Sequence, residues 1–233
     1  MSPVLRADVA PSRRVLFVAT AVVIASLALF VMIAEDLLDG GGLVAHDEAV
    51  LRWFVDHRTD WMISAARLVS AIGGLVSLLI ASAVLALWLW RRGKPLAIAI
   101  TPTVSLLLAS VAWTAAKAAF GRVRPPISVQ ETRVVSPAFP SGHACDAAAF
   151  CLAAAFVIAI TFADNGRRQL AFIGIGAFVA GLVGVSRLIL GVHWLSDVVA
   201  GWALGTALAT ATVAISWYGT TRNPQPCRDQ EKE

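Results

Sequence analysis

Residues 15–34 read VLFVATAVVIASLALFVMIA, an uncharged run of twenty residues that follows Arg13 and Arg14. A helix needs about 20 apolar residues to cross the hydrocarbon core of a bilayer. A signal peptide has an apolar region of only about 7–15 residues and a cleavage site of small residues, whereas this run continues into Glu35 and Asp36. We therefore predict a retained transmembrane helix.

Five further apolar runs follow, at residues 71–90, 96–116, 144–163, 170–190 and 195–218. The 233-residue chain is 58% hydrophobic and 15% charged, whereas soluble domains are about 25% charged. This composition excludes an ordinary soluble domain, and six spans leave no room for a second domain of usual size. We predict an all-α fold, a polytopic six-transmembrane helix bundle. Residues 1–218 would form this single membrane-embedded domain, and residues 219–233 a disordered cytoplasmic tail.

The distribution of Lys and Arg predicts the orientation of the spans, because short cytoplasmic loops carry an excess of both. Eleven of the nineteen cations lie at span ends that an alternating path brings to one side: Arg6, Arg13, Arg14, Arg91, Arg92, Lys94, Arg167, Arg168, Arg222, Arg228 and Lys232. Both termini are therefore predicted to be cytoplasmic, in a multi-pass protein of the cell membrane. Sixteen Arg against three Lys suggest a GC-rich bacterial genome, and hence the bacterial inner membrane.

Two features depart from plain spans. Residues 43–67 are apolar but interrupted by charged residues such as Asp47, Asp56 and Asp60 and by His57, which favours an interfacial helix leading into the second span. Glycines also occur inside the apolar runs with no flanking strand, so close packing of helices is a better explanation for them than nucleotide binding. These glycines are Gly174, Gly176, Gly181, Gly184, Gly201 and Gly205.

Polar residues at the opposite, extracytoplasmic ends of the spans have no evident structural purpose. Lys117 closes the third run and Arg187 lies within the fifth, where an unpartnered charge costs about 2.5 kcal/mol or more. His143 opens the fourth run, and His193 and Asp197 open the sixth. Alone, Lys117 could snorkel to the interface and His143 could be an ordinary interfacial histidine. Together, these residues indicate a functional site at the extracytoplasmic face.

His193 and Asp197 are four residues apart, which places them on one helical face. The carboxylate can then orient the imidazole and raise the basicity of its other nitrogen, as in catalytic histidine–carboxylate pairs. A structural ion pair would have the same spacing.

The segment Pro140-Ser141-Gly142-His143 immediately precedes the fourth run. Backbone N–H groups at a helix N-terminus bind anions such as phosphate, although a Pro-Ser-Gly turn is also a common helix start. Lys117 can add a point charge. Arg124 and Arg187 can each add a planar set of donors that matches phosphate oxygens. An anion site is the more economical interpretation.

Three motifs resemble those of the type 2 phosphatidic acid phosphatases, the lipid phosphate phosphatase family. They are Lys117, six residues, then Arg124-Pro125; Pro140-Ser141-Gly142-His143; and Ser186-Arg187, five residues, His193, three residues, then Asp197. The resemblance implies that His193 attacks phosphorus and forms a phosphohistidine, that Asp197 orients it, and that His143 is the general acid. It also implies that Lys117, Arg124, Ser141, Gly142 and Arg187 bind the phosphate oxygens.

Other polar residues near these motifs have less definite roles. Arg122 and Arg133 could add affinity for the headgroup, but a solvated loop is the expectation for each. Asp146 could contact His143 or make a buried polar contact elsewhere in the bundle. The sequence places no carboxylate cluster suited to magnesium beside the motifs, so we expect no metal and no cofactor.

The expected function is hydrolysis of the terminal phosphate of a lipid phosphate or diphosphate. Phosphatidic acid, phosphatidylglycerol phosphate and polyprenyl diphosphate all fit, because the motifs recognise only the phosphate. The alternatives are a phosphotransferase that passes the group to a lipid or sugar hydroxyl, and an anion transporter. Soluble vanadium haloperoxidases have a similar pocket, but six spans argue against that reading. The expected partners are the substrate and the bilayer; a net charge of +4 is too small an excess to indicate nucleic acid.

Overall fold

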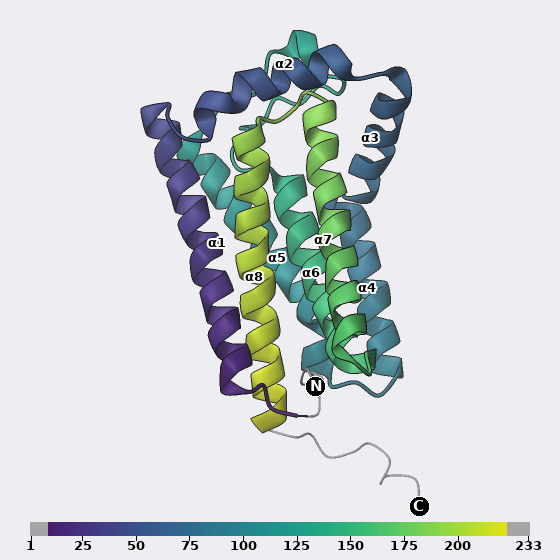
Figure 1. Cartoon of the computed structure of the whole chain (residues 1–233). Helices are drawn as coiled ribbons and strands as arrows, with labels where there is room; N and C mark the ends of the chain where they lie inside the picture. The colour runs from purple at the N-terminus through teal and green to yellow at the C-terminus, as the bar shows by residue number, and fades with distance from the viewer. Residues whose placement is uncertain (1–8, 223–233) are drawn as a thin grey trace, which may run out of the picture.

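The computed structural model describes residues 9–222, and every regular element in this range is helical. The elements are α1 (Arg13–Asp39), η1 (Val44–His46), α2 (Asp47–His57), α3 (Asp60–Ile72), α4 (Leu75–Arg91), α5 (Leu96–Phe120), η2 (Ile127–Val129), α6 (Gly142–Phe162), α7 (Gly166–Ile189) and α8 (Leu195–Arg222). The predicted all-α fold is confirmed (Figure 1). α8 continues to Arg222, past the predicted end at residue 218, and residues 223–233 of the predicted tail lie outside the described range.

Six segments are long and apolar enough to cross a bilayer. Five are the single helices α1, α5, α6, α7 and α8, and the sixth is the pair α3 and α4, which is bent by 52°. The predicted second span, residues 71–90, is therefore not one straight helix. It breaks at Gly73 and Gly74, and its first half reaches back to Asp60.

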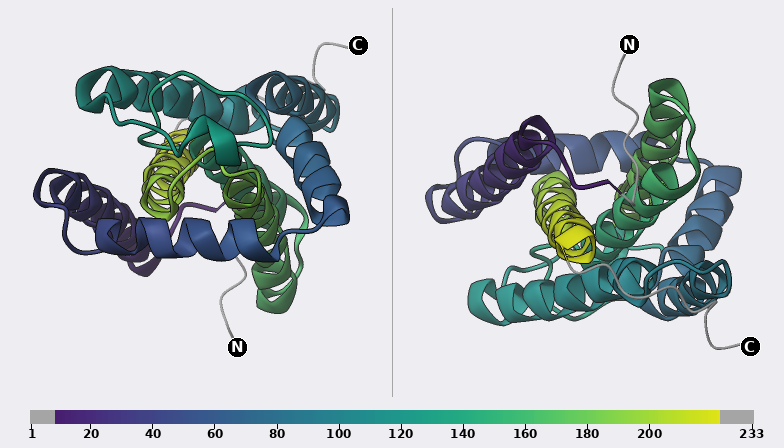
Figure 2. Two further views of the ribbon diagram at one scale, coloured as in Figure 1. Left: turned by 90° about the horizontal axis from the view of Figure 1, so that it is seen from above. Right: turned by 90° about the horizontal axis from the view of Figure 1, so that it is seen from below.

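α6 is the most buried of the spans, and α5, α7 and α8 pack around it. The helix is rich in small residues, with buried alanines at 144, 147, 148, 149, 153, 154 and 155. Small side chains let neighbouring backbones approach closely in a membrane, where dispersion contacts drive helix association. α1 packs mainly on α8 at the edge of the bundle, as both end-on views in Figure 2 show. The N-terminus of α6 is held by its packing against α5 and α8.

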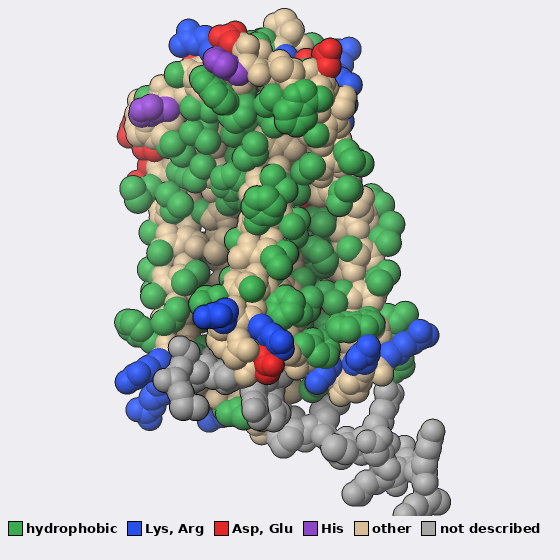
Figure 3. Space-filling view, turned by 45° about the vertical axis from the view of Figure 1, so that its right-hand side comes forward, with side chains coloured by type: hydrophobic (Ala, Val, Ile, Leu, Met, Phe, Trp, Pro, Cys, Tyr) green, Lys and Arg blue, Asp and Glu red, His purple; other side chains and the backbone are tan. Residues whose placement is uncertain are grey.

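Side-chain type divides the surface into zones, as expected for a multi-pass membrane protein. Apolar side chains cover the middle of the bundle, and charged side chains lie at its two ends, with Lys and Arg at both ends and His at the α2 end (Figure 3). The cations of the predicted cytoplasmic set that lie in the described range are at helix ends: Arg13, Arg14, Arg91, Arg92, Lys94, Arg167, Arg168 and Arg222. At the other end, α2 lies across the bundle and connects α1 to α3.

The glycines fall into two groups. A Cβ added at Gly176, Gly184, Gly201 or Gly205 would lie within 2.7 Å of an atom of a neighbouring helix, so these glycines do permit close packing. The packing interpretation is wrong for Gly174 and Gly181, because no atom of the described residues lies within 4 Å of a Cβ at either.

Gly205→Ala is expected to lower the free energy of unfolding by about 1–3 kcal/mol, the usual cost of overpacking. The new Cβ would lie 2.4 Å from the carbonyl oxygen of Cys145 and 2.8 Å from the Cβ of Ala148, so backbone must move. Gly181→Ala is the matched control and should not lower stability. Thermal unfolding of both variants in detergent measures the difference. Equal midpoints would contradict the assignment of Gly205 as a packing glycine.

Candidate active site

The predicted site residues meet at the end of the bundle that carries α2. Six segments supply them: the last turns of α5 and α7, the 121–141 loop, the start of α6, the 190–194 loop and the start of α8. The residues brought together are Lys117, Arg124, Ser141, Gly142, His143, Arg187, His193 and Asp197.

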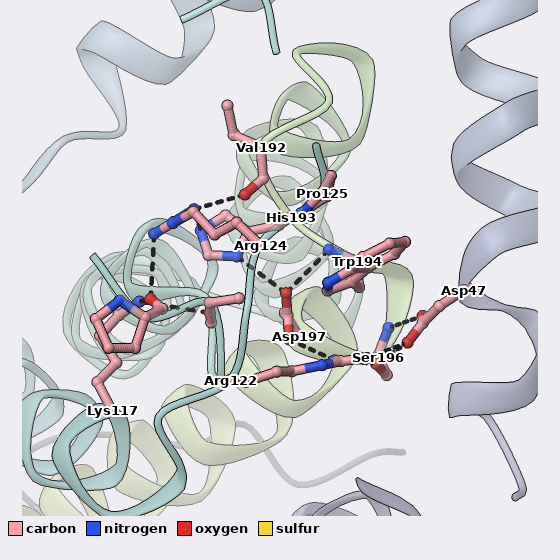
Figure 4. Close-up of polar contacts among 12 residues, drawn as sticks. Asp47, Lys117, Arg122, Arg124, Pro125, Val192, His193, Trp194, Ser196 and Asp197 are labelled. Atoms are coloured by element: carbon pink, nitrogen blue, oxygen red, sulfur yellow. Dashed lines mark hydrogen bonds and ion pairs between the residues drawn. The ribbon is translucent and has the colours of Figure 1, made fainter. Parts of the chain in front are cut away.

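The geometry of His193 and Asp197 indicates the tautomer of the imidazole. His193 Nδ1 lies 3.2 Å from Asp197 Oδ2, and the Trp194 N–H donates to the same oxygen at 2.9 Å (Figure 4). On the other side of the ring, Arg124 Nη1 lies 3.0 Å from His193 Nε2. Arginine can only donate, so Nε2 is the acceptor and the proton sits on Nδ1, facing the carboxylate. The lone pair therefore sits on Nε2, which makes Nε2 the ring nitrogen that can act as a nucleophile.

The surroundings of His193 keep its ring neutral. The residue is 2% exposed. Burial, followed by the positive charges of Arg124, Arg187 and Lys117, lowers its pKa well below the ordinary value of 6.5. An imidazole with a lowered pKa remains unprotonated at neutral pH, which nucleophilic attack requires.

Backbone carbonyls of the 136–138 segment hold two of the cations in place. Lys117 Nζ donates to the carbonyl oxygen of Pro137, and also to that of Ala138 at 3.4 Å. Arg124 donates from Nη2 to the same Pro137 oxygen at 3.3 Å and from Nε to the Ser136 oxygen at 2.6 Å. Two like charges are thus fixed beside His193, which leaves a strongly positive site.

Two further polar atoms in the site are buried without a partner. Ser141 is fully buried and Arg187 is 6% exposed. Among residues 9–222, Ser141 Oγ, Arg187 Nε and Thr161 Oγ1, the last near the far end of α6, are the buried side-chain polar atoms that lack a hydrogen bond. An unsatisfied buried polar group costs about 1–3 kcal/mol. Two such atoms in one cationic site indicate a place for a ligand that accepts hydrogen bonds.

The start of α6 is anchored by its backbone and not by a side-chain cap. Ser141 is the N-cap residue, yet its side chain makes no capping hydrogen bond. Its N–H donates to the Asp197 carbonyl oxygen at 2.9 Å. A Cβ at Gly142 would lie 3.0 Å from the Trp113 ring, so a larger residue would push Trp113 of α5 away from the start of α6 by a few tenths of an ångström. The Ser141 hydroxyl thus remains available to a ligand.

The broken second span forms part of the site, which the sequence analysis missed. Ser70, near the end of α3, accepts a hydrogen bond from Arg187 Nη1. A Cβ at Gly74 would lie 3.7 Å from His143 Nε2. The adjacent glycines at 73 and 74 are the only sequence signal of this break.

The expectation for Arg122 is wrong. Its side chain is 14% exposed and forms ion pairs of 2.6 Å with Asp197 Oδ1 and with Asp47 Oδ2. It therefore lies directly behind the histidine–carboxylate pair and not in solvent; Arg133, by contrast, is exposed. Asp146 makes its contact elsewhere in the bundle, accepting from Ser110 Oγ at 3.0 Å and Trp113 Nε1 at 2.9 Å.

Within the described part of the chain, no group of three or more His, Cys, Asp and Glu side chains is arranged to hold a metal ion. The charged groups close enough to act on His193 include the cations Lys117, Arg124 and Arg187. Metal-independent chemistry stays a prediction.

Fold and site together define a polytopic membrane protein with a buried histidine–aspartate pair in an anion-binding site that is lined by Lys and Arg. The chain belongs to the PAP2 superfamily, whose family profile matches residues 98–221. The match begins at the start of α5 and ends in the last turn of α8, so it includes all three motifs.

Curated relatives and a solved structure agree with this membership. The chain is 32% identical over 127 residues to an undecaprenyl-diphosphatase of Sulfolobus acidocaldarius, over 52% of this chain and 57% of the relative. It is 38% identical over 90 residues to phosphatidylglycerophosphatase B of Bacillus subtilis, over 37% and 42% of the two chains. The chain thus spans about half the length of these relatives. The crystal structure of a transmembrane PAP2 type phosphatidylglycerolphosphate phosphatase from Bacillus subtilis has the same fold, with a TM-score of 0.73, 22% identity, and coverage of 87% of this chain and 98% of that one.

Proposed function

We propose that this protein is an integral membrane phosphatase that hydrolyses the terminal phosphate of a lipid phosphate or diphosphate. The observation that carries the proposal is the pair of buried, unpartnered donors, Ser141 Oγ and Arg187 Nε, beside neutral His193. Phosphate oxygens would satisfy both. The names of the two curated relatives, a diphosphatase and a phosphatase, support the same reaction class.

The proposed reaction has two steps. His193 Nε2 attacks phosphorus and forms an N–P bond as the P–O bond to the lipid breaks, while His143 donates a proton to the departing oxygen. Water then attacks the phosphohistidine, His143 takes a proton from that water, and inorganic phosphate leaves with both histidines restored. Since His193 must be neutral and His143 protonated at the start, a bell-shaped pH profile is expected.

The remaining residues would stabilise charge on the phosphoryl group. Phosphoryl transfer depends mainly on positioning and charge neutralisation. Lys117, Arg124, Arg187, the Ser141 hydroxyl and the Gly142 N–H would hold the equatorial oxygens. Arg124 Nη1 would pass its hydrogen bond from His193 Nε2 to a phosphate oxygen, which frees the lone pair for attack.

The charge distribution supports an extracytoplasmic site. The cations at the end opposite α2 would face the cytoplasm by the positive-inside rule, with both termini on that side. The site would then open at the outer face of the bacterial inner membrane, where the phosphate of an acyl or prenyl lipid lies.

A panel of lipid phosphates tests this function. Purified protein is mixed separately with phosphatidic acid, phosphatidylglycerol phosphate and a polyprenyl diphosphate in detergent micelles, with and without a chelator. Inorganic phosphate is expected from at least one lipid, at the same rate in both conditions. Transfer of the phosphoryl group to an added lipid or sugar alcohol would favour the transferase, and loss of activity with chelator would contradict metal independence. No release from any lipid would overturn the proposal.

A further inference from the structure

A chain of charged contacts connects α2 to the candidate nucleophile. Asp47, the first residue of α2, is 3% exposed. It accepts from Arg122 Nη2 at 2.6 Å, from Ser196 Oγ at 2.6 Å and from the Ser196 N–H at 2.9 Å. Arg122 Nη1 then donates to Asp197 Oδ1 at 2.6 Å, and Asp197 Oδ2 faces His193 (Figure 4). Five side chains from four segments, namely α2, the 121–141 loop, the 190–194 loop and α8, thus form one continuous network.

We propose that Arg122 and Asp47 are positioning residues for His193, an inference that rests on the proposed function. Arg122 locks the orientation of the Asp197 carboxylate, and Asp47 locks Arg122. Neither residue contacts phosphate in this role.

Arg122 controls which oxygen of Asp197 faces the histidine. The carboxylate has one oxygen for His193 Nδ1 and the Trp194 N–H, and the other for Arg122. With Oδ1 held by a charged donor at 2.6 Å, the carboxylate cannot rotate away from His193 without breaking a charge-assisted hydrogen bond. The orientation of the imidazole, and hence the direction of its Nε2 lone pair, depends on this restraint.

Asp47 restrains the Arg122 guanidinium through its second terminal nitrogen, Nη2. A guanidinium presents donors in a fixed plane, so two carboxylates bound to its two terminal nitrogens determine its orientation. The Trp194 ring also lies 5.7 Å from the Arg122 guanidinium carbon, which limits its movement out of that plane. Both terminal nitrogens of Arg122 are engaged by carboxylates, whereas Arg124 contacts His193 Nε2 and Arg187 Nε has no hydrogen-bond partner.

The charge balance supports the same role. Asp197 is fully buried, and a buried carboxylate needs a cation and hydrogen bonds. Arg122 supplies the cation, and Asp47 prevents Arg122 from adding a net positive charge behind the histidine. A lysine at position 122 could supply the charge, but its ammonium group lacks the planar donors that bind two carboxylates in fixed directions.

The test compares kcat, KM and inhibition by inorganic phosphate for a set of variants, with dioctanoyl phosphatidic acid in detergent micelles as the probe. The variants are Asp47→Asn, Arg122→Lys, Arg122→Gln and the double variant Asp47→Asn with Arg122→Gln. Glu131→Gln is the matched control, because it removes an ion pair of 3.0 Å with Arg58 at the same end of the bundle. Thermal unfolding is measured for all.

Arg122→Gln and the double variant are expected to lose about 10- to 100-fold in kcat. This is the usual loss when a residue that orients a functional side chain through a hydrogen bond is removed. KM and inhibition by phosphate should stay near the wild-type values, because Lys117, Arg124 and Arg187 are unchanged. Arg122→Lys should recover part of the loss. Asp47→Asn should lose less than Arg122→Gln, and Glu131→Gln should match the wild type.

Several outcomes would overturn the proposal. A purely structural role predicts a lower unfolding temperature with unchanged kcat per folded protein, or equal losses in kcat and in phosphate binding. If Arg122→Gln does not fold, two other variants test the positioning role. The double variant leaves no unpaired charge at these two positions, and Asp47→Asn keeps the Arg122–Asp197 pair. An active wild type with an inactive His193→Ala but fully active Arg122 and Asp47 variants refutes this inference alone. If phosphatidic acid releases no phosphate, the variants are compared on the panel lipid that does. A wild type that is inactive on every lipid of the panel, or an active His193→Ala, refutes the proposed function.

Discussion

His193→Ala is expected to lower kcat for phosphate release by about 10⁴- to 10⁶-fold, the range seen when a residue of a nucleophilic catalytic unit is removed. Its Nε2 is the only protein atom in the proposed mechanism that bonds to phosphorus. Reaction with lipid labelled in its terminal phosphate, followed by quenching with base, should trap a phosphoprotein in the wild type. The variant should show none.

The control for this substitution is His57→Ala. His57 lies at the same end of the bundle, but it is exposed on α2, and its Nδ1 contacts the Trp53 carbonyl oxygen at 2.7 Å. Its removal should leave kcat unchanged. Phosphate release by folded His193→Ala at the wild-type rate would exclude His193 as the nucleophile.

Asp197→Asn is expected to cost about 10⁴-fold in kcat, as in a serine protease whose orienting aspartate is replaced by asparagine. The amide nitrogen of Asn would donate to His193 Nδ1, which moves the ring proton to Nε2 and removes the nucleophilic lone pair. KM should change much less, because the phosphate-binding cations are untouched. Steady-state kinetics with the lipid that the panel identifies measures both constants.

Asp146→Asn provides a matched comparison. Asp146 is also a buried aspartate near the start of a span, and a single oxygen accepts from both Ser110 and Trp113. The amide oxygen of Asn can keep both hydrogen bonds, so kcat should stay close to the wild-type value. Equal losses for Asp146→Asn and Asp197→Asn would show that burial of a carboxylate, and not orientation of His193, explains the effect.

The apolar runs predicted most of the fold because bilayer thickness limits the length of a span. The run at residues 15–34, for example, lies within α1. The break at Gly73 and Gly74 was not predicted, since the apolar pattern continues across it. It depends on the packing of Gly73 against Val183 of α7, where a Cβ would lie 2.5 Å from the Val183 side chain.

The sequence by itself determined the membrane fold, and the short spacing between residues within each motif identified the candidate site residues. His193 and Asp197 are four residues apart, so local helix geometry already places them together. Only the tertiary structure decided that Arg122 is paired and not solvated, because its partner Asp47 is 75 residues away. Local periodicity carries no information about ion pairs between distant segments. They form only when packing brings α2 and α8 to the same end of the bundle.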